Sequence, residues 1–331
     1  MRFPSVWPLN SNRLPKILPI VLALLCFSCS KSTAPTISAA EENGPLASAE
    51  ASELATGDPV YFGVLAIDSA VSVTERYRAF MDYLSQELGR PVELVILSQE
   101  DQFTKVAEGE IDFITSNPLA SVQVQRLHNT EFLVTQNRPK TGTQFGGLII
   151  VNRDSDIIDV ADLKDKRAAC VNFQTAAAGC TFQIYHLLQQ DFDPHQDFSS
   201  FIENKSQDNI VLAVLNGVID VGFIRTGQLE KMVTKGMLSS TDELRIIDIA
   251  EDGFQYPHTT DLYPEWSVAS APGTDATLVQ QMRSALLSLP EDHPALAKMK
   301  TAGFVEPVDY GQLNQLIETL KLKTWDVQKT N

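Results

Sequence analysis

From residue 60 onwards, short apolar runs alternate with stretches in which apolar residues recur every three or four positions. Continuous apolar runs of this length are typical of buried strands, whereas the spacing of three and four is typical of amphipathic helices. The pattern predicts strands over residues 60–67, 92–97 and 111–115, with helices between them, the second over 100–108. Strands that alternate with helices indicate an α/β fold in which a parallel sheet is covered on both faces.

Local signals predict the end of the first helix and the start of a later one. The first helix is marked by apolar residues that share one face: Tyr77, Phe80, Met81, Leu84 and Leu88. Gly89 predicts its end, and Pro91 prevents it from resuming. A later helix is predicted to begin at Pro118 with Asn117 as its N-cap, because proline fits the first helical position and asparagine satisfies the free backbone N–H groups.

A weak internal repeat suggests two similar lobes. Residues 107–114 are echoed by residues 215–224, and in both segments a helix ends near a glycine and a strand follows at Ile-Asp. Each strand then leads into polar residues, Ser116-Asn117-Pro118 in one copy and Arg225-Thr226-Gly227 in the other. Ligands of open α/β sheets lie beyond the carboxyl ends of the strands, so we expect these polar segments to face each other across a cleft.

Two chain crossings are expected between the lobes. One crossing strand is predicted over residues 143–151 and the returning one over 266–271, followed by helices near 275–289 and 310–322. We therefore assign residues 59–145 together with 256–331 to lobe 1 and residues 146–255 to lobe 2. Two crossings form a hinge, and hinge closure around a ligand is a recognised motion of two-lobed proteins.

The N-terminus has the pattern of an export signal. Basic residues precede an apolar run of residues 17–27, which is too short to span a bilayer, where about 20 residues are needed. Ser28 before Cys29 resembles a bacterial lipobox, which predicts a lipoprotein signal peptide over residues 1–28 and lipidation of Cys29. An ordinary signal peptide cleaved near Ser30 is the alternative, and no other stretch of the chain is apolar enough to cross a membrane.

Residues 29–58 are rich in Ala, Ser, Thr, Glu and Pro and contain almost no large apolar residue. Such a segment buries too little surface to fold, so we interpret it as a flexible tether between a lipid anchor and the folded body. We therefore expect a periplasmic protein attached to a bacterial membrane. Ser30 after the lipidated cysteine resembles the sorting pattern for the outer rather than the inner membrane.

The charge balance argues against nucleic acid as a partner. The net charge is −16, and removing residues 1–28, which contain three basic and no acidic residues, makes it −19. Contacts to phosphate backbones require clustered basic residues. We also find no nucleophile–base pair, paired-carboxylate motif, phosphate-binding glycine loop or zinc-ligand spacing. The sequence therefore predicts a protein that is not an enzyme and needs no cofactor, and we expect a monomer.

Several residues are candidates for holding a small anion. Backbone N–H groups at helix N-termini, hydroxyl donors and a guanidinium are the usual oxyanion ligands. Ser116 and Asn117 open one helix and Gln174 and Thr175 open the equivalent turn of lobe 2, although Asn117 alternatively serves only as a cap. Arg225, with Thr226 beside it, follows a buried strand, where it binds either an oxyanion or a structural partner, Asp220 or Glu230.

Three further candidates lie close to the predicted hinge. Phe145, followed by Gly146, either lets the backbone approach the ligand or acts only in the hinge. His258 and Tyr263 precede the returning strand, and a histidine in such a place is more often a hydrogen-bonded structural residue than a ligand. Arg138 precedes Pro139 in a polar stretch, where it either points to the cleft or lies in a solvated loop, and we expect the loop.

Two cysteines of the body flank the turn of lobe 2. Cys170 ends a predicted strand and Cys180 is expected to start a helix. Export permits a disulfide between them, which would fix the lip of the pocket. The alternative is a free Cys180 thiol at a helix N-terminus, which would be acidic and reactive.

The order of several motifs resembles a known family. Residues 110–118, Phe145-Gly146-Gly147, 162–167 and 212–220 resemble the phosphonate-binding subunit of ABC importers, a type II periplasmic-binding-protein family. Residues 225–230 and the segment 258–266, which includes Leu262-Tyr263-Pro264-Glu265-Trp266, resemble more closely the periplasmic sensor domains of tetrathionate-sensor-type histidine kinases. The turn 172–180 differs from the Ser/Gly-rich turn usual in phosphonate binders, and no kinase region follows the body.

The resemblance implies two binding functions. In the first, the protein captures a phosphonate, phosphate or similar oxyanion for the membrane permease of an ABC importer. In the second, it is a ligand-binding subunit for a separate histidine kinase and recognises a sulfur oxyanion such as tetrathionate or thiosulfate. An enzyme on the same fold is the third hypothesis, because fold alone does not determine function.

Overall fold

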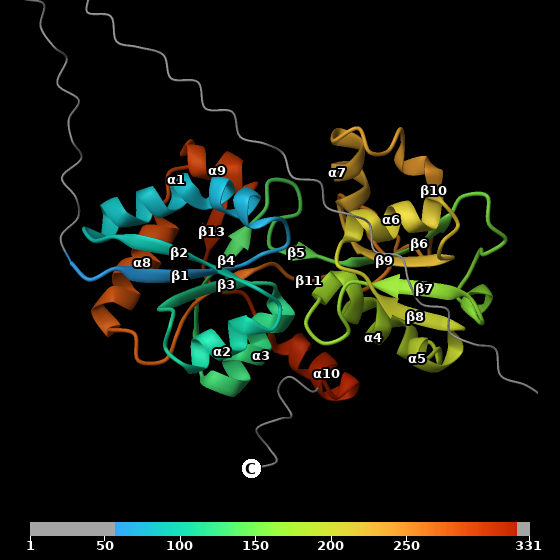
Figure 1. Cartoon of the computed structure of the whole chain (residues 1–331), viewed down its shortest axis with the longest axis horizontal. Coiled ribbons are helices and arrows are strands. Elements are labelled where there is room, and N and C mark those ends of the chain that lie inside the picture. Colours follow the sequence, from blue (N-terminus) through green and yellow to red (C-terminus); the bar gives the residue numbers. More distant parts are fainter. Residues whose placement is uncertain (1–56, 323–331) are drawn as a thin grey trace, which may run out of the picture. The chain divides into compact units, whose positions relative to one another are not determined.

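The computed structural model describes residues 57–322, so the predicted signal peptide, Cys29 and most of the predicted tether lie outside the described residues. The described chain has a mixed α/β fold built around two larger sheets (Figure 1). This confirms the predicted fold class. None of the helices in this part of the chain is long and apolar enough to cross a membrane.

The first sheet, with the helices packed on it, is called lobe 1 here. Its strand order is β13-β4-β12-β3-β1-β2. In chain order the bounds are β1 Val60–Leu65, β2 Val92–Leu97, β3 Phe113–Ser116, β4 Glu131–Asn137, β12 Ser267–Ser270 and β13 Gly303–Val305. Strands β1, β2 and β3 pair in parallel, whereas β12 is antiparallel to both β3 and β4. A segment from near the C-terminus therefore completes the middle of this sheet.

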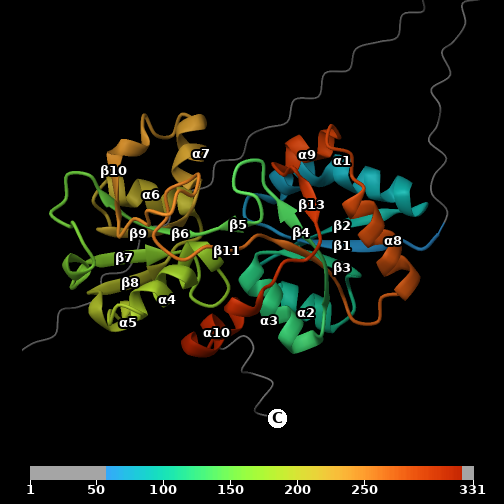
Figure 2. The same cartoon turned by 180° about the vertical axis from the view of Figure 1, so that it is seen from behind.

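Helices cover both faces of the lobe 1 sheet (Figures 1 and 2). On one face lie α1 Ala70–Leu88, α8 Ala276–Leu287 and α9 Pro294–Met299, whose apolar residues form one core with Phe62, Phe113 and Val134. On the other face lie α2 Asp101–Ala107 and α3 Pro118–His128, which pack on Leu97, Ile114 and Ala269. As predicted, α1 ends at Gly89, which adopts a φ of 64°, and Asn117 caps α3. Helix α9 had no counterpart in the sequence prediction.

The second sheet with its helices is called lobe 2. Its strand order is β10-β6-β9-β7-β8, and the bounds are β6 Gly147–Asn152, β7 Arg167–Cys170, β8 Ser200–Glu203, β9 Val221–Arg225 and β10 Leu244–Ile247. Helices α6 Gln207–Leu215 and α7 Gln228–Thr234 pack on one face, and α4 Phe182–Leu188 and α5 Pro194–Asp197 pack on the other. Three short turns complete the lobe, η1 Ala161–Leu163, η2 Ala177–Thr181 and η3 Thr241–Glu243.

A two-stranded antiparallel ribbon connects the lobes. It consists of β5 Gln144–Phe145 and β11 Tyr263–Pro264, which pair residue by residue (Figure 1). The prediction of one strand over 143–151 was wrong, because the chain breaks into β5 and β6 at Gly146. A Cβ atom at Gly146 would lie 3.2–3.3 Å from atoms of His258, Thr260 and Asp261. The predicted returning strand 266–271 is β12 inside lobe 1, and the crossing itself is β11.

The turn between β7 and α4 is held by a disulfide between Cys170 and Cys180. Both cysteines are completely buried. Cys180 does not start an α-helix as expected but lies in η2, a π-helical turn that precedes α4. The wider turn places five residues, Ala177 to Thr181, against the core before the regular helix begins.

An apolar cluster on the side of α10 joins both lobes to the hinge. Helix α10, Gly311–Leu320, contributes Leu313, Leu316 and Ile317. These residues pack with Leu119 and Val122 of lobe 1, with Phe145 and Tyr263 of the ribbon, and with Ala177, Phe182 and Tyr185 of lobe 2. Burial of this many large side chains favours contact between the lobes on this side of the hinge.

Candidate ligand-binding site

Arg225 is the last residue of β9 and lies beside the hinge. It pairs in register with Gly147, and its backbone N–H donates to Gln207 Oε1 at 2.9 Å. Its guanidinium donates through Nη1 to the carbonyl oxygen of Thr226, also at 2.9 Å. In the described part of the chain, this side chain forms no ion pair with a carboxylate within 4.0 Å.

Neither structural partner considered for Arg225 is used. Asp220 Oδ1 instead accepts from Arg167 Nη2 at 2.7 Å, and its Oδ2 accepts from the Arg167 backbone N–H and Nε. Glu230 stays near Arg225 as a charge without forming an ion pair. The Arg225 guanidinium is therefore half-buried and keeps most of its donors free of carboxylates, the condition expected of a residue that binds an external anion.

Burial lowers the pKa of the Arg225 guanidinium, and the positive charge of Arg138 lowers it further. The carboxylates of Glu265, Asp68 and Glu230 act in the opposite direction. Arg138 and Glu265 come from the lobe 1 side of the hinge, and Asp68 from the N-terminal end of α1. Groups from lobe 1 therefore act electrostatically on a side chain of lobe 2.

Arg138, expected in a solvated loop, is instead half-buried and paired with a carboxylate. It directly follows β4, and its Nε lies 3.3 Å from Glu265 Oε2. Its Nη1 donates to the carbonyl oxygens of Lys300 and Met299 at 3.2 and 3.4 Å. The available signal was the same one that singled out Arg225, a cation directly after a buried strand.

More charges extend this group along α1 and α7. Arg76 pairs with Asp68, and Lys231 and Lys235 lie 3.7 and 3.9 Å from carboxylate oxygens of Asp208. Burial, opposed by Asp208 and reinforced by Arg225, lowers the pKa of Lys231. We call this group the interlobe charge cluster; it contains Asp68, Arg76, Arg138, Asp208, Arg225, Glu230, Lys231, Lys235 and Glu265. Five basic and four acidic residues make it locally positive in a strongly acidic protein.

Other candidates from the two lobes contact each other away from Arg225. They are Asn117 at the N-terminus of α3 and Gln174 and Thr175 in the turn of lobe 2. Asn117 Nδ2 donates to the carbonyl oxygen of Thr175 at 2.9 Å, while Asn117 Oδ1 accepts from the N–H of Ala120 at 3.1 Å. Gln123 Nε2 donates to the carbonyl oxygen of Gln174 at 2.9 Å. These bonds link the lobes directly.

The side chains of this contact are engaged within the protein. Ser116 Oγ donates to Gln102 Oε1 at 2.7 Å, and Thr175 Oγ1 donates to Asn172 Oδ1 at 2.9 Å. Ser116, Asn117 and Thr175 are all buried. The contact they form is closed, whereas Arg225 retains free donors.

The candidates near the hinge have mainly structural contacts. His258 is buried, with Nδ1 2.7 Å from the carbonyl oxygen of Thr260 and Nε2 3.1 Å from both carboxylate oxygens of Asp252. Tyr263 stacks on Phe182 with ring centroids 3.9 Å apart, and burial raises the pKa of its hydroxyl. Phe145 also packs on Phe182.

Thr226 bonds to the chain at the break between β5 and β6. Its N–H donates to the carbonyl oxygen of Gly146 at 2.9 Å, and its Oγ1 accepts from the N–H of Gly146 at 3.4 Å. Because Thr226 directly follows Arg225, these bonds fix the position of Arg225 relative to the hinge.

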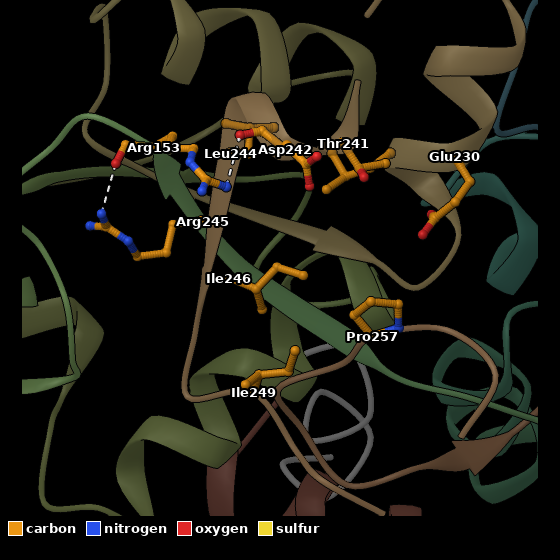
Figure 3. A pocket seen from close by; sticks show the side chains of 10 residues that line it. Arg153, Glu230, Thr241, Asp242, Leu244, Arg245, Ile246, Ile249 and Pro257 are labelled. Carbon is orange, nitrogen blue, oxygen red and sulfur yellow. Dashed lines mark hydrogen bonds between the residues drawn. The ribbon is translucent and has the colours of Figure 1, made fainter. Parts of the chain in front are cut away.

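A cavity of about 360 Å³ lies elsewhere, on lobe 2 (Figure 3). None of the predicted site residues lines it. Its two arginines are taken up by backbone carbonyls, since Arg153 donates to Asp242 at 3.3 Å and Arg245 donates to Arg153 at 2.7 Å and Ile157 at 2.6 Å. Arg225 therefore has more hydrogen-bond donors available for an anion than Arg245 of this cavity. Within residues 57–322 no group of three or more His, Cys, Asp or Glu residues is placed to hold a metal ion.

Comparisons with known proteins agree with this architecture. Residues 62–310 match the family model described as ABC transporter, phosphonate, periplasmic substrate-binding protein. The structure superposes with a TM-score of 0.65 on PhnD1 from Prochlorococcus marinus in complex with methylphosphonate, at 15% identity over 80% of this chain and 98% of that one. It also superposes with a TM-score of 0.65 on a binding protein component of an ABC phosphonate transporter from Pseudomonas aeruginosa, at 17% identity over 82% and 89% of the two chains. At these identities the superpositions show the fold alone, which is the type II periplasmic-binding-protein fold.

One curated relative belongs to a signalling system. The tetrathionate sensor histidine kinase TtrS of Salmonella typhimurium is 23% identical over 233 residues, which cover 69% of this chain. The chain spans 39% of the length of that relative.

Proposed function

Because the chain belongs to the family of periplasmic substrate-binding proteins of phosphonate ABC transporters, we propose that it captures a small oxyanion at Arg225, between its two lobes. Membership of the family gives a solute-binding role outside the cytoplasm. The proposal adds the class of ligand, such as phosphonate, phosphate or phosphite, and its place in the molecule.

The observation that carries this proposal is the state of the Arg225 guanidinium. It is half-buried, has no carboxylate partner among the described residues and is close enough to Arg138 for that positive charge to lower its pKa. Removing a cation from water without a counter-ion costs free energy, so such an arrangement persists where a ligand supplies the negative charge. A guanidinium suits an oxyanion because its planar fork donates two parallel hydrogen bonds.

The proposed partner in transport is the membrane permease of an ABC importer. We further propose that the mature chain is anchored by a lipid on Cys29, with residues 29–58 as the tether. The sequence Ser28-Cys29 supports this. Metabolic labelling with a clickable fatty acid should mark the wild-type protein and not Cys29→Ser; labelling that is lost in Cys26→Ser instead would place the anchor at the other cysteine.

The similarity to TtrS supports a second candidate, a ligand-binding subunit that reports a sulfur oxyanion to a separate histidine kinase. The genes beside this one separate the two candidates. Permease and ATPase genes favour import, whereas histidine kinase and response-regulator genes favour signalling.

A thermal-shift screen of the purified protein tests the ligand class. The panel contains phosphate, methylphosphonate, phosphite, sulfate, thiosulfate and tetrathionate, each with and without reductant. A ligand at one hundred times its Kd stabilises a protein by about 2.7 kcal/mol, which is readily measured. A phosphorus oxyanion as the hit supports the importer, and a sulfur oxyanion supports the sensor.

Two matched variants locate the site. Arg225→Gln should abolish the shift, whereas Arg153→Gln, in the separate cavity of lobe 2, should leave it unchanged. The opposite result would move the site to that cavity, and the absence of a shift with every anion would refute an oxyanion ligand.

A further inference from the structure

Three charged residues stand at the ends of three strands that meet at the hinge. Arg225 ends β9 in lobe 2, Arg138 follows β4 in lobe 1, and Glu265 follows β11 of the connecting ribbon. Backbone hydrogen bonds hold Glu265 and Arg138 near the ribbon. The N–H of Glu265 donates to the carbonyl oxygen of Thr143 at 2.7 Å, and Arg138 exchanges backbone hydrogen bonds with Gly142.

Two of the three nitrogen atoms of the Arg138 guanidinium have partners within the protein, and the third has none among the described residues. Its Nε faces Glu265 Oε2 at 3.3 Å, and its Nη1 donates to the carbonyl oxygens of Met299 and Lys300. Within residues 57–322 its Nη2 has no hydrogen-bond partner. The guanidinium is thus held in one orientation with donors to spare, and a preorganised donor loses little entropy when it binds.

The Glu265 carboxylate pairs with Arg138, and its negative charge also acts on Arg225. It is buried, with its side chain 8% exposed, and it also accepts from the N–H of Trp266 at 3.2 Å. One carboxylate that acts on two guanidiniums offsets part of their mutual repulsion and leaves a net positive charge. An arriving anion can therefore supply the charge that is missing.

We propose that Arg138 is a second ligand-binding residue, which grips the same oxyanion from lobe 1 that Arg225 grips from lobe 2. This inference rests on the proposed function and deepens it. The ligand then bridges the lobes, so its binding favours their closure.

The chemical consequence is a preference for the more highly charged oxyanion. Attraction to a second nearby cation increases in proportion to the charge of the ligand. Arg138 therefore favours an anion with two negative charges, such as thiosulfate or doubly ionised phosphate, over a sulfonate with one. Several acceptor oxygens are also needed, because donors reach the ligand from two sides.

Titration calorimetry at mildly alkaline pH tests this with three probes, inorganic phosphate, thiosulfate and methanesulfonate. The proteins are wild type, Arg138→Gln, Arg225→Gln, the double variant and Arg283→Gln. Arg283, which lies on α8 away from the hinge ribbon, pairs with Glu306 and serves as the matched control. The thermal midpoint of each ligand-free variant identifies any that fail to fold, and Arg138→Lys tests rescue by charge alone.

We expect each single variant at the hinge to weaken binding of the dianion at least about tenfold, the loss of about one charge-assisted contact. Arg138→Gln should also reduce the ratio of dianion to methanesulfonate affinity, which a purely structural loss would not change. The effect of Arg138→Gln should shrink in the Arg225→Gln background, because both residues bind one ligand.

The outcomes separate the two claims. If Arg225→Gln abolishes binding while Arg138→Gln behaves like Arg283→Gln, the inference is wrong and the proposed site stands. If Arg138→Gln weakens all probes equally, Arg138 is structural and the inference is again wrong. If no probe binds the wild type, or if Arg225→Gln binds normally, the proposed function or its site fails as well.

Discussion

The Nδ2 atom of Asn117 donates to the carbonyl oxygen of Thr175 at 2.9 Å, while Oδ1 of the same side chain accepts from the N–H of Ala120 at 3.1 Å. One residue thus caps α3 in lobe 1 and holds the turn of lobe 2. The turn in question is the one closed by the Cys170–Cys180 disulfide. The same side chain therefore connects helix stability with contact between the lobes.

Replacing Asn117 separates these two contributions. Asn117→Ser keeps a good N-cap but removes the donor to Thr175, and it should lower the free energy of unfolding by about 1 kcal/mol. Asn117→Ala loses both contacts and should cost about 2 kcal/mol. Urea unfolding measures both changes. No loss in Asn117→Ser would show that the contact with Thr175 contributes nothing, and equal losses in the two variants would show the same of the cap.

The stack of Tyr263 on Phe182 predicts that the tyrosine ring, not its hydroxyl, matters for the fold. Tyr263→Ala should lower the free energy of unfolding by about 3–5 kcal/mol, because it leaves a cavity in the apolar cluster beside the hinge. Tyr263→Phe should be nearly neutral in urea unfolding and in ligand affinity. A loss of affinity in Tyr263→Phe would instead assign the hydroxyl to the ligand, the role considered from the sequence.

Reduction of the Cys170–Cys180 disulfide should destabilise the protein. Closing a loop of about ten residues restricts the unfolded chain, and by the chain-entropy estimate the bond contributes about 3 kcal/mol. Thermal unfolding with and without a strong reductant measures the difference. The Cys170→Ala/Cys180→Ala double variant is the control, since it should be less stable than the oxidised wild type and insensitive to reductant.

Asp220 should contribute to stability at neutral pH and not in acid. Hydrogen bonds from Arg167 hold the pKa of this carboxyl below its ordinary value of 3.8, despite some burial. A group whose pKa is lower in the folded state stabilises the protein above its unfolded-state pKa. That contribution disappears as the pH falls through the folded-state pKa.

Asp220→Asn should therefore show a modest loss in the urea midpoint at pH values above about 5, which shrinks below about pH 4. Ligand affinity should not change, because Asp220 does not pair with Arg225. A gap that persists unchanged in acid would show that the ion pair with Arg167 is not its cause.

The sequence predicted those parts of the fold that depend on neighbouring residues. Gly89 ends α1 and Asn117 with Pro118 starts α3 because capping acts within a few residues of the chain. Arg225 became a candidate for a similar reason, since a charge at the end of a buried strand is conspicuous. The break at Gly146 was missed because it depends on the close approach of residues 258–261, which are more than a hundred positions away.

The sequence also did not predict which charged residues form ion pairs with each other. Asp220 lies nearer to Arg225 along the chain, yet the parallel pairing of β7 with β9 places Arg167 beside it. Arg138 had no counter-ion within local reach, so the polar stretch around it predicted a solvated loop. Its partner Glu265 is brought to it only by the return of the chain through the ribbon.

The place of β12 has a consequence for how the chain folds. This strand lies between β3 and β4, so the lobe 1 sheet has a gap until residues 267–270 arrive. All strands of lobe 2 lie within residues 147–247 and can pair as soon as that segment is available. Contacts between distant residues form slowly, because the intervening loop must first be closed. During synthesis, strands β1 to β4 therefore stay incompletely paired until residues 267–270 have been made. In a protein that is exported, this delay would keep lobe 1 unfolded, and so able to pass through a translocation channel, until it has left the cytoplasm.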